Sequence, residues 1–116
     1  VKKVVFQQEE KIIEPTVKRT VISKKTSDII KKMLLSTVEK GEVKWLIPKG
    51  YKIAGKTGTA QWNSTKENHA WFTSFAPYDQ PKIVVTVLVE EGREGSVVAE
   101  PIARDFLAWW GKKYAN

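Results

Sequence analysis

Cysteine is absent from this chain of 116 residues, and histidine occurs once, as His69. The absence of cysteine excludes disulfides and cysteine-based metal sites, and a lone histidine cannot build a metal site. No apolar run approaches the roughly 20 residues that a membrane-spanning helix needs, and no signal peptide is visible. We therefore expect no metal, no cofactor and no membrane-spanning helix. Because the chain begins VKKVVF, without methionine, we expect it to be part of a longer protein.

Arginine is also scarce, with Arg19, Arg93 and Arg104 the only three, although the net charge is +7. The positive charge comes mainly from lysines that are scattered and interleaved with glutamates, which is typical of a solvated surface. A nucleic-acid interface would need basic residues clustered with aromatic residues on one face. We therefore predict no nucleic-acid partner, and keep a basic interaction module as an alternative that a salt-dependent binding titration would test.

The first half of the chain predicts short strands followed by a helix. Residues 3–8 and 11–23 carry β-branched residues in partial alternation, with a break at Pro15. A helix follows, capped by Thr26 or Ser27 and stopped at Gly41. Its expected buried face consists of Ile29, Ile30, Met33, Leu34 and Val38.

The second half predicts three strands joined antiparallel and a closing helix. The strands are expected at residues 51–62, 70–78 and 82–92, and the nearly continuous apolar run of the third predicts cover on both of its faces. In the helix of residues 97–114, Pro101 suits the first turn. Its expected apolar face consists of Val98, Ile102, Phe106 and Trp109. This order indicates an α+β fold, an antiparallel sheet with a helix before it and a helix after it packed on the sheet.

The stretch GYKIAGKT, residues 50–57, fits the letter pattern of a phosphate-binding P-loop. A P-loop must follow a buried strand and open a helix, so that backbone N–H groups surround the phosphates. Here a short segment ending at Pro48 precedes the pattern, and strand-forming residues follow it. The context therefore argues against a P-loop.

The alternative is a Lys-Thr-Gly triplet on a strand that lines a cleft, as in serine enzymes that recognise penicillin. Gly58 has no side chain, so a substrate can approach the backbone closely. Thr57 and Thr59 alternate along the strand, so both hydroxyls lie on one face and can bind a carboxylate. Lys56 supplies positive potential beside them.

The longer GKTGTAQ and its surroundings resemble the C-terminal part of the transpeptidase domain of class B penicillin-binding proteins, and HAWFTSFAPYDQPKI is most similar to the cell-elongation type. The resemblance implies a peptidoglycan D,D-transpeptidase that cross-links stem peptides through a serine acyl-enzyme and is trapped by β-lactams. It implies catalytic roles for Lys56 and Thr59, whose N–H would form half of the oxyanion hole. It also implies that the substrate or β-lactam lies against Thr57, Gly58, Thr59, Ala60 and Gln61.

The two other motifs of that family, S-x-x-K and S-x-N, do not occur in residues 1–116. We therefore interpret residues 1–116 as a single C-terminal fragment of the domain, which needs the upstream half and is inactive alone. The resemblance implies a location on the extracytoplasmic side of the cell membrane. Exposed strand edges lead us to expect a dimer or larger species of the fragment, and a clean monomer in light scattering at high concentration would contradict this. A serine β-lactamase or D,D-carboxypeptidase fragment is the other alternative.

The sequence leaves open whether several aromatic residues pack in the core or lie at the surface. Trp62 and Trp71 flank the loop after the motif, where they would shape the mouth of a cleft or pack in the core. In the closing helix one of Trp109 and Trp110 is expected to face the sheet, and Trp110 is the one expected to meet a missing partner. His69, at the start of a strand, is interpreted as a structural or surface residue.

Overall fold

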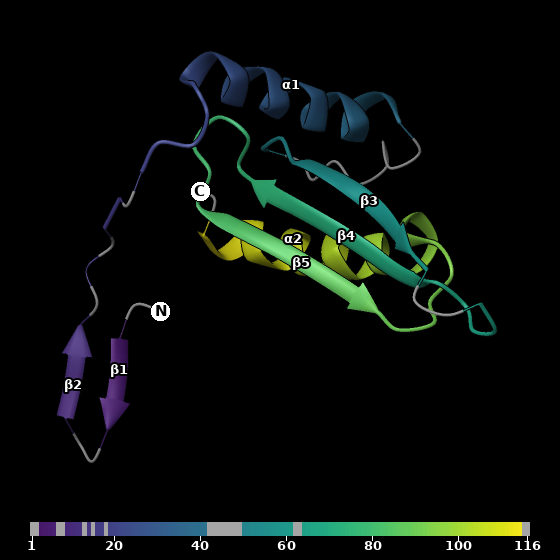
Figure 1. Cartoon of the computed structure of the whole chain (residues 1–116). Coiled ribbons are helices and arrows are strands. Elements are labelled where there is room, and N and C mark those ends of the chain that lie inside the picture. Colours follow the sequence, from purple (N-terminus) through teal and green to yellow (C-terminus); the bar gives the residue numbers. More distant parts are fainter. Residues whose placement is uncertain are drawn as a thin grey trace.

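The computed structural model has the expected α+β architecture (Figure 1). A three-stranded sheet lies between its helices, with α2 (Glu100–Tyr114) behind the sheet and α1 (Lys24–Lys40) along β3 (Ala54–Ala60). The structure describes residues 3–6, 9–12, 14, 16–17, 19–41, 50–61 and 64–114.

The sheet is antiparallel with the order β3-β4-β5, where β4 is His69–Ala76 and β5 is Ile83–Val89. Thr57 pairs with Phe72, and Phe72 pairs with Val87. Alternate residues of β4 are buried, as expected for a strand with one face against a helix. This face, with Phe72 at its centre, meets the buried side of α2 and forms the core.

The first residues form a separate hairpin (Figure 1). Strands β1 (Lys3–Phe6) and β2 (Glu9–Ile12) pair with each other as a two-stranded sheet. The first strand lies within the expected segment 3–8, whereas the second starts at Glu9, two residues before the expected segment 11–23, and ends at Ile12. Pro15, the expected break, lies outside the described residues.

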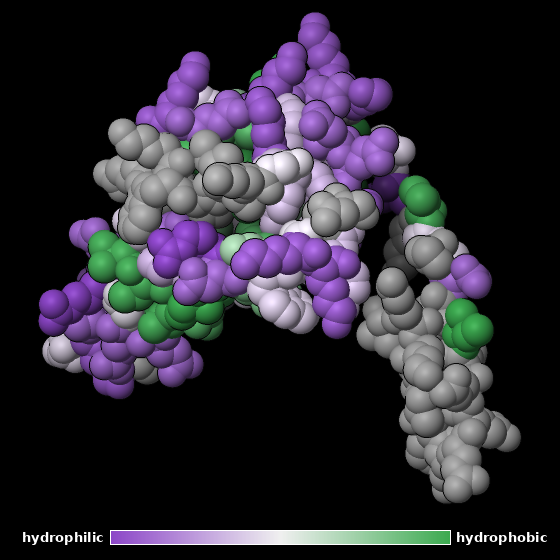
Figure 2. All heavy atoms as spheres, turned by 180° about the vertical axis from the view of Figure 1, so that it is seen from behind, coloured by the Kyte–Doolittle hydropathy of each residue, from purple (hydrophilic) through white to green (hydrophobic). Residues whose placement is uncertain are grey.

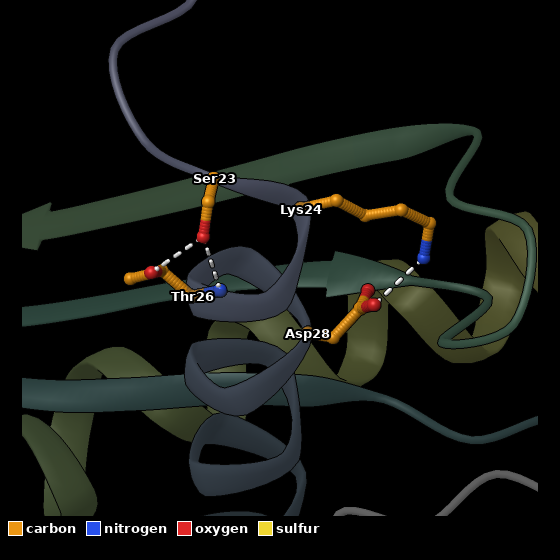
Figure 3. Close-up of polar contacts among 4 residues, drawn as sticks. All are labelled: Ser23, Lys24, Thr26 and Asp28. Carbon is orange, nitrogen blue, oxygen red and sulfur yellow. Dashed lines mark hydrogen bonds and ion pairs between the residues drawn. The ribbon is translucent and has the colours of Figure 1, made fainter.

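Helix α1 begins earlier than the sequence predicts. Ser23 is its N-cap, and the Ser23 hydroxyl accepts a hydrogen bond from the Thr26 amide at 3.1 Å (Figure 3). The predicted caps, Thr26 and Ser27, lie inside the helix because lysines 24 and 25 favour helix strongly enough to form its first turn. Lys24 Nζ also donates a hydrogen bond to Asp28 Oδ2 at 2.7 Å, and this bond lowers the pKa of the Asp28 carboxyl. Gly41 ends the helix, as predicted.

The expected buried face of α1 is largely wrong. Only Val38 is buried, whereas Ile29, Ile30 and Met33 are exposed, Met33 by 65%. The part of α1 that contacts the core is its C-terminal end, where Val38 joins the core cluster. The described residues leave the apolar side chains of the first turns uncovered.

Strand β5 is covered on one face, and the expectation of cover on both faces is wrong. Val84 is 69% exposed and Leu88 is also exposed, whereas the alternate residues Ile83, Val85 and Val87 are half-buried. The described helices leave one face of this edge strand open. Figure 2 views the molecule from behind, from the side on which α2 lies, and shows hydrophobic residues gathered at that surface beside strongly hydrophilic ones.

Helix α2 packs with a different face from the one predicted. Its buried residues are Glu100, Ala103, Leu107, Trp110 and Gly111, whereas Ile102, Phe106 and Trp109 of the predicted face are exposed. The small residues let the helix lie close to β4, so the bulkier stripe that was taken for the core remains outside.

Tyr51 explains two further differences. Its hydroxyl donates to the carbonyl of Leu107, and its ring lies edge-on to Trp110 with the centroids 6.2 Å apart. Trp110 is therefore only 8% exposed, and Trp109, at 53%, is the more exposed of the two tryptophans of this helix. Because Tyr51 packs on α2, the strand starts at Ala54, three residues later than predicted.

Candidate active-site cleft

The strand that carries the Lys-Thr-Gly triplet is held by close backbone packing. A Cβ on Gly55 would lie 2.8 Å from the carbonyl oxygen of Thr73, on the neighbouring strand β4. A Cβ on Gly95 would lie 2.2 Å from the carbonyl oxygen of Trp71 and 2.8 Å from that of Gly58. Real Cβ atoms do not approach backbone this closely, so glycine is required at both positions. The π-helix η2 (Gly95–Ala99) is thereby fixed against the glycine of the triplet.

A cleft of about 590 Å³ opens between β3 and the start of η2. The side chains of Thr57 and Thr59 lie on its lining, as alternation along a strand requires. The rest of the lining comes from the loop before β4, the loop after β5 and the start of η2, namely Glu67, Asn68, Arg93, Glu94, Gly95 and Ser96. The cleft therefore presents two hydroxyls to a ligand along the face of one strand.

Lys56 is exposed and lies beside the first of these hydroxyls. Its Nζ atom donates to the carbonyl oxygen of Thr57 at 2.9 Å and to Thr57 Oγ1 at 3.2 Å. The ammonium group thus lies next to a hydroxyl that lines the cleft. An anion bound to this hydroxyl would experience the positive charge at short range.

The other predicted site residues lie along the same strand. Gly58 is half-buried between the two threonines, and Ala60 and Gln61 are exposed at the end of β3. The structure thus brings Thr57, Thr59 and the Lys56 ammonium together, but Ala60 and Gln61 do not line the cleft. Trp62 lies outside the described residues.

Strand β3 is also an edge of the described sheet, since β4 is the neighbour with which it pairs. Backbone N–H and C=O groups on its outer side can therefore pair with an extended peptide. No helix follows the triplet, because residues 54–60 continue as a strand. This excludes the P-loop geometry, as predicted.

Sequence reasoning missed the wall opposite the threonines. The sequence predicts only that residues 93–96 join the third strand to the closing helix, yet Arg93, Glu94 and Ser96 line the cleft. The signal that could have found them is the pair Gly92 and Gly95, which flank charged residues in a short loop next to the motif strand.

Two loops meet at the end of this wall. The Arg93 amide donates to the Asn68 carbonyl at 2.9 Å, and the Glu91 amide donates to Nδ1 of His69 at 3.1 Å. Ion pairs Lys66–Glu91, at 2.9 Å, and Arg93–Glu67, at 3.4 Å, join the same loops. His69 therefore has the structural role that the sequence predicts.

Within the described ranges, no three His, Cys, Asp or Glu side chains are grouped to hold a metal ion. Among the described helices, none is long and apolar enough to cross a membrane.

Comparison with known proteins is consistent with this geometry. Residues 1–108 match the family described as "Penicillin binding protein transpeptidase domain". Peptidoglycan D,D-transpeptidase MrdA of Haemophilus influenzae is 46% identical over 74 residues, 52% of this chain and 11% of the relative. Peptidoglycan D,D-transpeptidase PbpA of Mycolicibacterium smegmatis is 34% identical over 110 residues, 88% of this chain. The chain thus spans only about a tenth to a fifth of these relatives, 11% and 20%.

Solved structures agree. The D,D-transpeptidase domain of a peptidoglycan glycosyltransferase from Eggerthella lenta superposes with a TM-score of 0.74 at 28% identity, covering 94% of this chain and 26% of that one. Penicillin-binding protein A from M. tuberculosis, as a ceftriaxone acyl-enzyme complex, gives 0.69 at 32% identity, covering 78% and 22%. These matches confirm the predicted resemblance and the partial fold, and the chain belongs to the penicillin-binding protein transpeptidase domain family.

Proposed function

We propose that this chain supplies one wall of the active site of a peptidoglycan D,D-transpeptidase, which cross-links stem peptides through a serine acyl-enzyme and binds β-lactams. The observation that carries the proposal is the joint placement of Thr57 and Thr59 on one cleft, with Lys56 Nζ 3.2 Å from Thr57 Oγ1. The relatives named above are D,D-transpeptidases, and one structural neighbour is an acyl-enzyme with a cephalosporin.

The proposed chemistry follows from charge. The substrate dipeptide and a β-lactam both carry a carboxylate, which the two threonine hydroxyls bind while Lys56 stabilises it electrostatically. The outer edge of β3 pairs with the peptide backbone along Gly58, Ala60 and Gln61. In this arrangement the Thr59 amide is an oxyanion-hole donor, a group whose loss typically costs about 2.7–4 kcal/mol of transition-state stabilisation.

The nucleophile comes from the S-x-x-K segment of the upstream part of the domain, since no serine of this chain starts that motif. A nucleophile and its base must lie within hydrogen-bond reach. Residues 1–116 alone are therefore inactive, and the activity belongs to the assembled domain on the extracytoplasmic side of the membrane. Its ligands are stem peptides and β-lactams. A homologous penicillin-binding protein from Helicobacter pylori forms a complex with MreC, which supports a protein partner of this kind.

The test uses the full-length protein, in which residues 1–116 are joined to the upstream half. Labelled penicillin should acylate it, and Lys56→Met should slow acylation by about a hundred-fold or more because the charge beside the bound carboxylate is lost. The chain of residues 1–116 alone should take up no label. A folded full-length protein that is never acylated, with Lys56 and Thr59 intact, would refute the proposal.

A further inference from the structure

The half-buried side chain of His69 accepts a hydrogen bond from the loop that follows β5. The Glu91 amide donates to Nδ1 of His69 at 3.1 Å. A backbone N–H can only donate, so Nδ1 must be unprotonated, and the neutral ring carries its proton on Nε2. An imidazolium ring has N–H donors at both nitrogens and cannot accept this bond. The bond therefore exists only while His69 is neutral.

The loop on the donor side, residues 90–94, has an unfavourable backbone. The φ angle is 53° at Glu91 and 66° at Arg93, in the left-handed region that residues other than glycine rarely adopt. Such conformations persist only where the surrounding structure holds them. Here the Arg93 amide donates to the Asn68 carbonyl at 2.9 Å, and the Glu91 amide donates to His69. Two consecutive residues, Asn68 and His69, thus hold the two strained residues of the loop.

Both sides of this joint continue into the lining of the cleft. Asn68, directly before His69, lines the cleft, and so do Arg93 and Glu94, which follow Glu91 in the loop. His69 itself is outside the lining. The bond between His69 and Glu91 therefore fixes the wall of the cleft from behind, through the backbone of the loop.

The two bonds of the joint differ in their response to pH. The bond between Arg93 and Asn68 joins backbone groups, which do not titrate near neutral pH. Histidine, in contrast, changes its charge between about pH 8 and 5. The charged residues of the loops packed beside His69 are Lys66, Glu67, Glu90, Glu91, Arg93 and Glu94.

These charged neighbours belong to residue types that titrate outside that range. Lys66 pairs with Glu91 at 2.9 Å, and Arg93 pairs with Glu67 at 3.4 Å. Carboxyl groups ordinarily take up protons near pH 4, and lysine and arginine lose theirs above pH 10. On β3, the residue that pairs with His69 is the uncharged Ala60. The imidazole is therefore the group of this joint whose residue type titrates near neutral pH.

We infer that His69 is a positioning residue of the cleft, and that protonation of its ring releases the wall formed by the loop of residues 90–94. In the neutral state Nδ1 holds the Glu91 amide, and the lining stays fixed opposite Thr57 and Thr59. In the charged state two N–H donors face each other, so the strained loop loses one of its two bonds. Ligands of the cleft then bind more weakly at low pH. The effect on acylation rests on the proposed function.

The experiment measures the second-order rate constant for acylation of the full-length protein by labelled penicillin between pH 8 and 5.5. His69→Asn is the rescue variant, because its carbonyl oxygen lies as many bonds from Cβ as Nδ1, accepts a hydrogen bond and does not titrate. The ratio of the wild-type rate constant to that of His69→Asn should be near one at pH 8. It should fall about three- to ten-fold at pH 5.5, as expected for one lost hydrogen bond. The ratio cancels the titration of groups that both proteins share.

Two further variants separate the bond from other effects. His69→Phe keeps a ring but has no acceptor, so it should be slower than His69→Asn by the same factor at every pH. Glu91→Gln removes the carboxylate and keeps the backbone amide, so it should retain the pH dependence of the wild type. If His69→Asn is as slow as His69→Phe at every pH, His69 acts by another route and the inference is wrong. The inference also fails if the wild type and His69→Asn have the same pH dependence.

Hydrogen exchange reads the loop directly and does not require acylation. After correction for the intrinsic effect of pH on exchange, the peptide of residues 90–94 should lose protection in the wild type as the pH falls. It should stay protected in His69→Asn, whereas β4 should stay protected in every variant, which shows that each is folded. Equal protection of the loop in both proteins at every pH would overturn the inference. The expected exchange in a protein that penicillin never acylates would uphold the role of His69 in holding the loop and refute the proposed function.

Discussion

The face of the sheet that meets α2 is closed in one region and open in another. On the buried side, under α2, Phe72 and its alternate neighbours on β4 are fully buried and pack against small residues of the helix. On the cleft side, along β3 beside η2, Thr59 is exposed, and Thr57, which pairs with Phe72, is half-buried. On the buried side the volume of the side chains determines which residues fit. On the cleft side charge and hydrogen-bond geometry determine them. Substitutions should therefore separate stability from activity according to the side on which they lie.

The largest effect is expected on the buried side. Phe72→Ala should lower the free energy of unfolding of the chain by about 3–5 kcal/mol, because a large ring is removed from a site with no exposed surface. Denaturant unfolding at fixed protein concentration measures this loss. Phe106→Ala, on the exposed face of α2, is the matched control and should cost far less. Equal losses at both positions would contradict the assignment of the α2 faces.

The next effect is expected on the cleft side. Thr57→Val removes one hydroxyl from the cleft while nearly keeping the volume of the side chain, so acylation of the full-length protein by labelled penicillin should slow by about ten- to a hundred-fold. Unfolding should change little. Thr73→Val is the control, since Thr73 Oγ1 lies 3.2 Å from Thr86 Oγ1 and outside the cleft lining. The prediction is wrong if both variants acylate alike.

The smallest effect concerns a polar group on the buried side. Glu100 is fully buried, and among the described residues neither of its carboxylate oxygens has a hydrogen-bond partner. Burial raises the pKa of the Glu100 carboxyl above the ordinary 4.5. Glu100→Gln should raise the free energy of unfolding at neutral pH by about 1–3 kcal/mol, because no charge needs to be buried.

The pH dependence sharpens this prediction. The folded chain holds the Glu100 proton more tightly than the unfolded chain, so protonation stabilises the fold fully below pH 4.5. This stability is lost as the pH rises through the higher folded pKa. The contribution should disappear in Glu100→Gln, as unfolding curves across this range would show. If the wild-type chain and the Glu100→Gln variant had the same free energy of unfolding at neutral pH, the prediction would be wrong.

The type of each main element could be predicted from sequence, because hydrophobic alternation and helix-end signals are local. Which helix face is buried could not. In α2 the choice between Leu107 and Phe106 depends on how closely the helix approaches the sheet, and the small residues of the helix that lie against β4 decide this. The edge position of β5 likewise depends on pairing across the sheet, so the exposure of Val84 was missed.

One part of the candidate site could also be predicted from sequence, and another part could not. Thr57 and Thr59 are two residues apart on a strand, so their common face follows from periodicity alone. Arg93 and Glu94 lie more than thirty positions later, and only the pairing of β4 with β3 and β5 brings them opposite the threonines. A single sequence carries no signal for that pairing distance.

The contact of Gly95 with Gly58 and Trp71 also makes a natural boundary for engineering. Residues 90–94 precede Gly95 in the sequence and form a loop whose exposed side chains can be exchanged. Because Gly95 stays in contact with β3, the positions of Thr57 and Thr59 should not change. A loop from a relative could be grafted there, with Gly95 as the fixed joint. The strand that carries the Lys-Thr-Gly triplet and the exchanged loop could then be varied as separate parts of one protein.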